Sequence, residues 1–195
     1  EEKMEKLVSK LNAPDKEERL SALKELVKIS PRPKGEGDVN NHIHTWYSFS
    51  PYSPSKAVWM SYISGLETAG IMDHDSVAGA DEFLKAGRLA GVAVTSGIEL
   101  RAGMKNSLFA GVRINNPDQN GVAYMAFHAL PACGRAAVEK KLSSISKARG
   151  DRNRRMIENI NALTANLGIS LDYDSDILPL SKASEGGSVT ERHLL

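Results

Sequence analysis

The sequence contains a single cysteine, Cys133, and therefore cannot form a disulfide bond within the chain. It also contains neither a charged-then-apolar leader nor a long apolar run, the features that mark a signal peptide and a membrane-spanning helix. From these absences we expect a cytoplasmic protein that does not enter a membrane. Secretion with a removed leader is left open as the alternative.

The chain has no excess of either charge, because 25 Lys and Arg residues stand against 24 Asp and Glu residues. This balance gives no evidence of an extended nucleic-acid-binding surface, although it leaves a focused charged cleft open. Hydrophobic residues make up 41% and charged residues 25% of the 195 residues, which is typical of a globular protein and not of a disordered or fibrous one. We expect one globular domain with an appendage; the composition leaves the oligomeric state open.

Two stretches with apolar residues at helical spacing open the sequence, and they end at Pro14 and Pro31. Their apolar residues are Met4, Leu7, Val8 and Leu11, then Leu20, Leu23, Leu26 and Val27. They predict a helical appendage over residues 1–30, whose role as a dimer contact or as a lid on the base of a barrel is left open. The prolines and glycines of PRPKGEGDVNN then predict a linker over residues 31–39.

Beyond the linker, strand-like and helix-like stretches alternate in the order βαβαβ. The predicted strands cover residues 41–46, 66–72 and 92–100, and the predicted helices cover residues 55–64 and 80–90. Such alternation favours parallel strands with helices packed outside them. Two further strands are predicted over 107–114 and 122–130. A charged helix follows over 135–167; we expect it to break at Gly150 and interpret its charges as a solvated face.

The stretch NNHIHTWYSF places His42 and His44 two positions apart in the first predicted strand. Alternate residues of a strand point to the same face, so the two imidazoles can bind one metal ion. An isolated pair of this kind is equally compatible with a solvated strand face or with hydrogen bonding in the core. The pair alone does not decide between these interpretations.

Later strands also bring polar residues to the ends of apolar runs. The second predicted strand ends in Asp73, His74 and Asp75, which could also simply begin the turn into the next helix. The run VAVTSGIEL carries one carboxylate, Glu99, in apolar surroundings, where a carboxylate requires a cation nearby. The run GVAYMAFHAL carries His128 late in the strand, and on its own this residue is more simply a hydrogen-bonded core histidine.

The combination of these residues carries more weight than any one of them. Four of the five histidines and Glu99 lie in or just after successive predicted strands, which a parallel arrangement places at one end of a barrel. Imidazole and carboxylate ligands together suit zinc, manganese or iron, and a glutamate among several histidines can bridge more than one ion. We therefore predict a metal site.

The order HIHTWYSFSPYSP, IMDHDSVAG and GIEL resembles the PHP domain, the polymerase and histidinol phosphatase family of metal-dependent phosphoesterases. The tail RNRRMIENINALTANLGISLDYDSD, followed by SVTERHLL, resembles the branch of that family with an inserted helical subdomain. The resemblance covers residues 40–195. It implies an α/β fold, a distorted seven-stranded β/α barrel similar to a TIM barrel, which we expect to be incomplete in this chain and to carry the N-terminal helices as an appendage.

The resemblance also implies how the chain is divided and what it binds. Residues 40–133 would form the first part of the barrel, residues 134–187 the inserted helical subdomain, and residues 188–195 the return to the barrel, where we expect the chain to be truncated. The site would hold two or three divalent metal ions, zinc, manganese or iron. The implied metal ligands are His42, His44, His74, Glu99, His128 and His193.

Two features depart from the family pattern. Members usually carry an aspartate ligand five positions after the second histidine of the HxH pair, and this chain has Phe49 there. Members also close the site with a late DxH motif, and none follows His193 in this sequence. We expect the natural protein to continue to such a motif.

Further roles follow as hypotheses for the residues around the predicted metals. His74 is either a ligand or a catalytic acid–base group, Asp73 belongs with it to the catalytic set, and Asp75 orients the histidines. Arg101 lies two positions after Glu99 on the same strand face. Together with Arg192, it could bind phosphate oxygens.

These residues together predict a metal-dependent phosphoesterase. We expect it to hydrolyse a phosphomonoester or phosphodiester of a small nucleotide-like or sugar-phosphate substrate through a metal-bound hydroxide. One alternative is a metal-dependent hydrolase of another bond, such as an amide. Another is a catalytically impaired binding module, which Phe49 and the missing DxH motif motivate.

Overall fold

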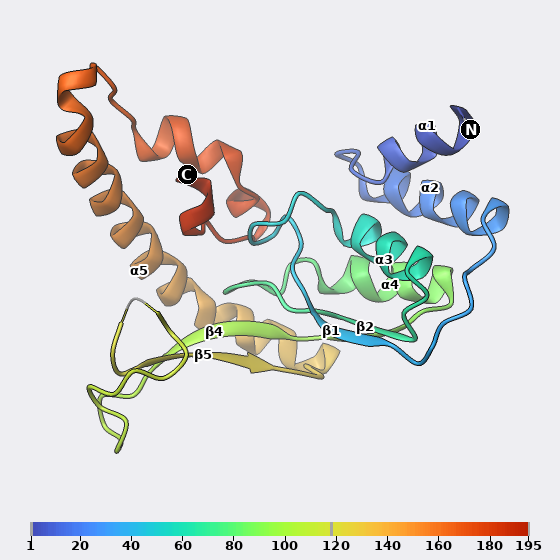
Figure 1. Ribbon diagram of the computed structural model, residues 1–195, viewed down its shortest axis with the longest axis horizontal. Helices are drawn as coiled ribbons and strands as arrows, with labels where there is room; N and C mark the ends of the chain where they lie inside the picture. The colour runs from blue at the N-terminus through green and yellow to red at the C-terminus, as the bar shows by residue number, and fades with distance from the viewer. Residues whose placement is uncertain (1, 118, 195) are drawn as a thin grey trace.

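The computed structural model describes residues 2–117 and 119–194 and has a mixed α/β architecture (Figure 1). Its helices are α1 Glu2–Lys10, α2 Lys16–Ile29, α3 Pro54–Ile63, α4 Ala80–Ala90 and α5 Ala132–Thr164. Its strands are β1 Val39–Ile43, β2 Thr68–Ile71, β3 Ala93–Ser96, β4 Ile98–Gly103 and β5 Val122–Phe127. The predicted α/β class is confirmed.

Strands β1, β2 and β3 form a parallel sheet in that order, with α3 and α4 as the crossover helices. Ser53 caps α3 by accepting a hydrogen bond from the Lys56 amide, and Pro54 supplies a first helical residue with a suitable φ. The predicted parallel βαβαβ unit is confirmed for these three strands. Parallel pairing brings the carboxyl ends of β1 and β2 to the same edge of the sheet.

The second sheet differs from the prediction, because β4 and β5 pair antiparallel. The predicted strand 92–100 divides at Gly97, where a Cβ atom would lie 2.6 Å from the carbonyl oxygen of Phe127. Because β5 runs opposite to β4, the prediction of one parallel set ending at a common barrel edge is wrong for β5. The described residues form five strands in two sheets, and they do not form a closed seven-stranded barrel.

Two further local predictions are wrong. Residues 107–114 form turns instead of a strand, with Gly111 at φ 76°. Leu108 is 96% exposed, and none of the described strands pairs with this segment. Helix α5 continues through Gly150 without a break. A helical glycine costs about 1 kcal/mol relative to alanine, and α5 offsets this cost by packing Leu142, Asn153 and Ile157 into the protein.

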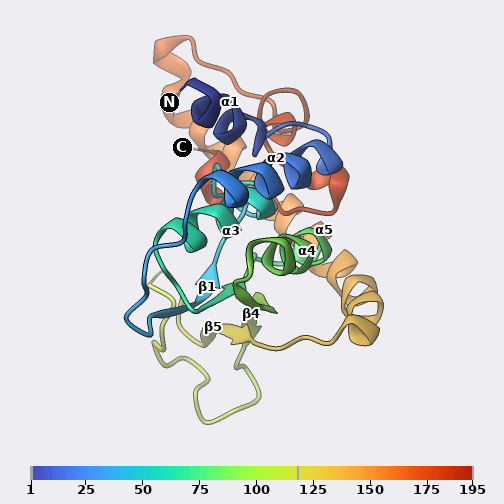
Figure 2. The same cartoon turned by 90° about the vertical axis from the view of Figure 1, so that its right-hand side faces the viewer.

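Helices α1 to α4 lie in two successive layers on one side of the parallel sheet, with α3 and α4 next to the strands and α1 and α2 beyond them (Figures 1 and 2). Leu11, Leu23 and Leu26 from the N-terminal segment are fully buried in the same core as Phe83 of α4. A buried ion pair joins Arg19 of α2 to Glu82, with Arg19 Nε 2.8 Å from Glu82 Oε1. The N-terminal helices therefore share the main core.

The segment that follows α5 consists of short 3₁₀ and π turns and packs back on that helix. Asn153, which is fully buried, donates from Nδ2 to the carbonyl oxygen of Val189 at 3.0 Å. The Ser188 amide donates to the Tyr47 carbonyl at 2.7 Å, and the Ser188 hydroxyl donates to the His74 carbonyl at 2.6 Å. The C-terminal segment thus contacts the loops that follow β1 and β2.

Among the described helices, none has the length and apolar character that crossing a bilayer requires.

The shared core predicts a large effect of one mutation in the N-terminal helices. Leu23→Ala should lower the free energy of unfolding by about 3 kcal/mol, because it removes a fully buried side chain and leaves a cavity. Leu89→Ala in α4, where the side chain is 38% exposed, is the matched control and should cost well under half as much. Urea unfolding measures both losses of stability. A loss for Leu23→Ala as small as that for Leu89→Ala would show that α2 does not belong to the main core.

Candidate metal centre

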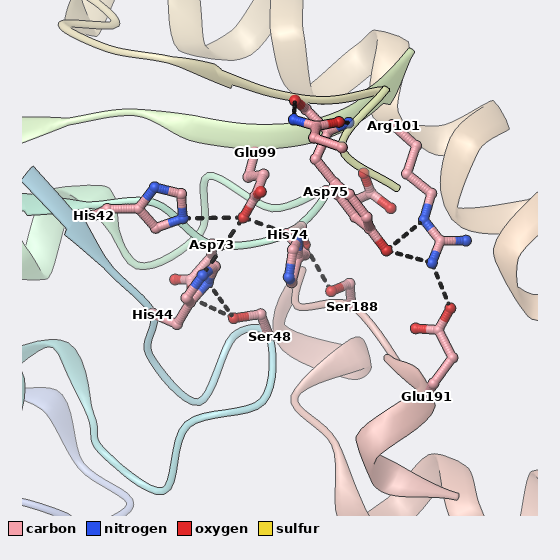
Figure 3. A network of polar contacts seen from close by, with 12 residues as sticks. His42, His44, Ser48, Asp73, His74, Asp75, Glu99, Arg101, Ser188 and Glu191 are labelled. Atoms are coloured by element: carbon pink, nitrogen blue, oxygen red, sulfur yellow. Dashed lines mark hydrogen bonds and ion pairs between the residues drawn. The ribbon is translucent and has the colours of Figure 1, made fainter. Parts of the chain in front are cut away.

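The two histidines of the HxH pair lie at the carboxyl end of β1 and point toward one carboxylate (Figure 3). His42 Nε2 lies 3.1 Å from Glu99 Oε2, and His44 Nε2 lies 3.5 Å from the same oxygen. Their ring centroids are 5.0 Å apart. The alternation of side chains along the strand thus places both imidazoles at one site, as the spacing predicts.

His74 joins them because the chain beyond β2 pairs with β4. The Asp75 amide donates to the Glu99 carbonyl at 3.0 Å, and the Glu99 amide donates to the Asp73 carbonyl at 3.1 Å. This short parallel bridge sets His74 beside Glu99, with His74 Nδ1 3.4 Å from Glu99 Oε2. One carboxylate oxygen therefore lies within 3.5 Å of nitrogens from three imidazoles.

Asp73 organises the loop that carries His44. Its carboxylate is 1% exposed and accepts hydrogen bonds from the Thr45 amide and hydroxyl, both at 2.6 Å, and from the Ser48 hydroxyl at 2.7 Å. Burial raises the pKa of Asp73, and these hydrogen bonds oppose the rise. Among the described residues, all hydrogen bonds to this carboxylate come from the loop that carries His44, so Asp73 positions that loop. Its catalytic role stays a prediction.

The three imidazoles and Glu99 lie in an open pocket of about 460 Å³. The pocket is lined by His42, His44, Phe49, His74, Glu99, Arg101, Tyr124, Arg149, Thr190, Glu191 and Arg192. Burial lowers the pKa of His44 from 6.5 to about 4, with a further contribution from His74. The pKa of His74 is also lowered to about 4, mainly by burial and then by the positive charge of Arg149. Both imidazoles are thus neutral near pH 7, the form that binds a metal ion.

The donor set fits a divalent metal ion. His42, His44 and Glu99 each offer one ligand atom, and these atoms lie within 4.8 Å of one another. Two imidazoles and a carboxylate form a ligand set that zinc, manganese or iron accepts. The residues therefore suit the ion that the sequence predicts, although the number of ions stays a prediction.

Phe49 lies where the family pattern has an aspartate, and its ring contacts the imidazoles directly. Its centroid is 4.5 Å from that of His44 and 5.5 Å from that of His74. The Arg192 guanidinium lies over the Phe49 ring, with Cζ 4.2 Å from the ring centroid. This side of the pocket presents an aromatic ring and a cation instead of a carboxylate.

The structure does not bring the other two predicted ligands to Glu99. His128 follows β5 and is exposed, and it does not line the pocket, because β5 runs antiparallel to β4. His193 lines a neighbouring pocket that shares Phe49 with the first. Its Nδ1 accepts a hydrogen bond from the Thr190 amide at 3.1 Å, and burial lowers its pKa.

A charged cluster beside the centre includes Arg149, Arg152 and Glu191, which the sequence patterns did not single out. Asp75 is buried and pairs with Arg149 of α5, whose Nε donates to Asp75 Oδ2 at 2.6 Å. Arg149 is 9% exposed, so interpreting the charges of α5 as a solvated face is wrong for this residue. Glu191 contacts Arg149 and also Arg101 and Arg152. Only the spacing of Arg149 and Arg152 on one helical face could have indicated this cluster.

No protein-family model and no curated protein matches the sequence. One solved structure with a similar fold, a proposed metal-dependent phosphoesterase from Bifidobacterium adolescentis, has a TM-score of 0.60 and 23% identity over 83% of this chain and 49% of that chain. Another, an amidohydrolase from Chromobacterium violaceum with bound sulfate and no metal, has a TM-score of 0.60 and 17% identity over 80% of this chain and 48% of that chain.

The likeness is one of fold. At these identities the two structures show that this chain shares the architecture of proteins described as hydrolases, and they do not show its family. The chain spans about half the length of each. The resemblance to the PHP domain therefore stays a prediction.

The lowered histidine pKa values predict a pH dependence of the chelator-treated protein. An imidazole with a pKa of about 4 in the folded state and 6.5 in the unfolded state stabilises the fold fully above pH 6.5 and loses this contribution as the pH falls toward 4. The loss should be about 3 kcal/mol per imidazole. Urea unfolding from pH 7 to pH 4 measures it.

The matched variants are His44→Gln and His128→Gln. His44→Gln should reduce this loss of stability, because it removes one buried imidazole, whereas His128→Gln should follow the wild type, because His128 is exposed. Identical pH profiles for the two variants would contradict the buried, neutral state of His44.

Proposed function

We propose that this protein is a metal-dependent hydrolase of PHP type that acts on a small phosphorylated substrate. The observation that carries the proposal is the convergence of three imidazoles on one oxygen of Glu99 in an open pocket with arginines on its wall. The fold that the chain shares with two proteins described as hydrolases supports the same reaction class.

His42, His44 and Glu99 would hold a divalent zinc, manganese or iron ion, with His74 as a further ligand. A bound ion of this kind supplies Lewis acidity and generates a nucleophile from water near neutral pH. The proposal extends to two or three ions if His74 and residues beyond this chain contribute. The positions of His128 and His193 give no support for their roles as ligands.

The residues of the chain contribute distinct functions around the substrate. Arg101 lines the pocket and is held by the Tyr124 hydroxyl, which accepts from Arg101 Nε at 3.0 Å, so its guanidinium is oriented before a phosphate arrives. Arg192 also lines the pocket and adds positive charge over the Phe49 ring. His74, if it is not a ligand, is neutral near pH 7 and can accept a proton.

Two alternatives have a specific observation in their favour. Hydrolysis of an amide is supported by the second similar structure, which is described as an amidohydrolase. The arginines in the pocket wall favour a phosphoester over it, because a neutral amide gives them no anionic partner. A binding module without catalysis is supported by Phe49, whose ring occupies one side of the centre.

The test compares phosphoester and amide hydrolysis by the zinc- or manganese-loaded protein. p-Nitrophenyl phosphate and bis(p-nitrophenyl) phosphate should be hydrolysed, and p-nitroacetanilide should not. Glu99→Gln should lower the phosphoester rate about 100-fold or more, because it removes the charge on which the imidazoles and a metal ion converge. Glu158→Gln, an exposed carboxylate on α5, is the matched control and should keep the rate.

Each of the other outcomes contradicts a different part of the proposal. Turnover of the amide alone would establish the amidohydrolase alternative. No turnover of any substrate, with metal bound and the fold intact, would favour the binding module. An unchanged phosphoester rate in Glu99→Gln would remove this centre from the reaction.

A further inference from the structure

Three arginines converge on one carboxylate at the edge of the candidate metal pocket. Arg101 Nη2 donates to Glu191 Oε1 at 2.9 Å, and Arg152 Nη2 also donates to Oε1. Arg149 Nη1 lies 3.4 Å from Glu191 Oε2. Three guanidinium groups, one from β4 and two from α5, thus share the single charge of Glu191.

Two of these arginines are held in place without Glu191. Arg149 is anchored by the buried carboxylate of Asp75 through Nε and Nη2. Arg101 is anchored by the Tyr124 hydroxyl, which lies 3.0 Å from Nε and 2.5 Å from Nη2. Figure 3 shows the Arg101 guanidinium beside the Glu191 carboxylate. Removing Glu191 from the cluster would therefore leave oriented donors behind.

Arg152 has a donor atom that Glu191 does not satisfy. Its Nε is buried and has no hydrogen-bond partner among the described residues. A buried donor without an acceptor is destabilising, so an oxygen of a ligand that accepts from this atom would be bound favourably. The carboxylate of Glu191 satisfies Nη2 of the same guanidinium but not Nε.

The cluster is accessible, and Glu191 is its most exposed member. The side chain of Glu191 is 33% exposed, compared with 18% for Arg101, 27% for Arg152 and 8% for Arg149. Arg101 and Arg149 line the metal pocket, and all three arginines line a second pocket of about 410 Å³. Glu191 is the first residue of a short 3₁₀ turn, Glu191–His193.

We propose that Arg101, Arg149 and Arg152 form an anion-binding subsite beside the metal centre, and that Glu191 is an internal counter-ion with which the ligand competes. The ligand class is a tetrahedral oxyanion group such as phosphate or sulfate, because several guanidinium edges present more donors than one carboxylate accepts. A role of the subsite in turnover rests on the proposed function, whereas anion binding itself does not.

The test is calorimetric titration of the metal-free protein with inorganic phosphate, in chelator and at low salt. Glu191→Gln should bind phosphate about tenfold more tightly than the wild type, because the glutamine keeps the size of the side chain and removes the competing charge. Raising the salt concentration should weaken binding in both proteins. Equal or weaker binding by Glu191→Gln would overturn the proposal.

Matched arginine variants locate the binding. Adding Arg152→Gln to Glu191→Gln should abolish the gain, whereas adding Arg154→Gln should leave it unchanged, because Arg154 lies on the same helix but pairs with Asp174. Retention of the gain without Arg152 would place the phosphate elsewhere and overturn the subsite.

Two further results keep the subsite and the proposed function separate. If Glu191→Gln does not fold, Arg152→Gln in the otherwise unchanged chain decides the matter, since the subsite requires weaker phosphate binding than in the wild type. Phosphate binding with this pattern in a protein that hydrolyses no phosphoester would support the subsite and reject only the proposed function.

Discussion

A single carboxylate oxygen, Oε2 of Glu99, lies within 3.5 Å of three imidazole nitrogens, and much of the structure serves to place these four groups together. Parallel pairing of β1 and β2 brings the HxH pair and His74 to the same sheet edge. The backbone bridge between His74 and Glu99 then fixes the carboxylate among them. A carboxylate that is only 13% exposed is stabilised when it meets a cation, and the neutral imidazoles would be the other ligands of a bound metal ion.

The residues around the candidate metal centre form two groups. In the first group, the candidate metal ligands contact aromatic rings, with Phe49 against His44 and Tyr124 against His74. The arginines lie further along the pocket, where Asp75 and Glu191 balance them only in part. The phosphorylated substrate that we propose would contact both groups at once, because a phosphoryl group suits a metal ion and its oxygens suit guanidinium donors.

Much of this architecture could be predicted from local sequence patterns. The predicted helix over 80–90 has the bounds of α4, and the strand-end positions of the HxH pair, His74 and Glu99 correctly indicated that they meet. The direction of β5 could not be predicted, because alternation of side chains is the same in parallel and antiparallel strands. For the same reason His128 resembled a ligand. The partners of Arg149 and Arg152 come from distant segments, which helical spacing alone does not reveal.

The most direct test of the centre is anomalous X-ray scattering from crystals of the protein grown with zinc, with data collected at the zinc absorption edge. The account predicts a strong anomalous peak at roughly 2.0–2.2 Å from nitrogens of His42 and His44 and an oxygen of Glu99, and loss of this peak in Glu99→Gln. Zinc peaks elsewhere in the molecule, with none among these three side chains, would show that they do not form a metal centre.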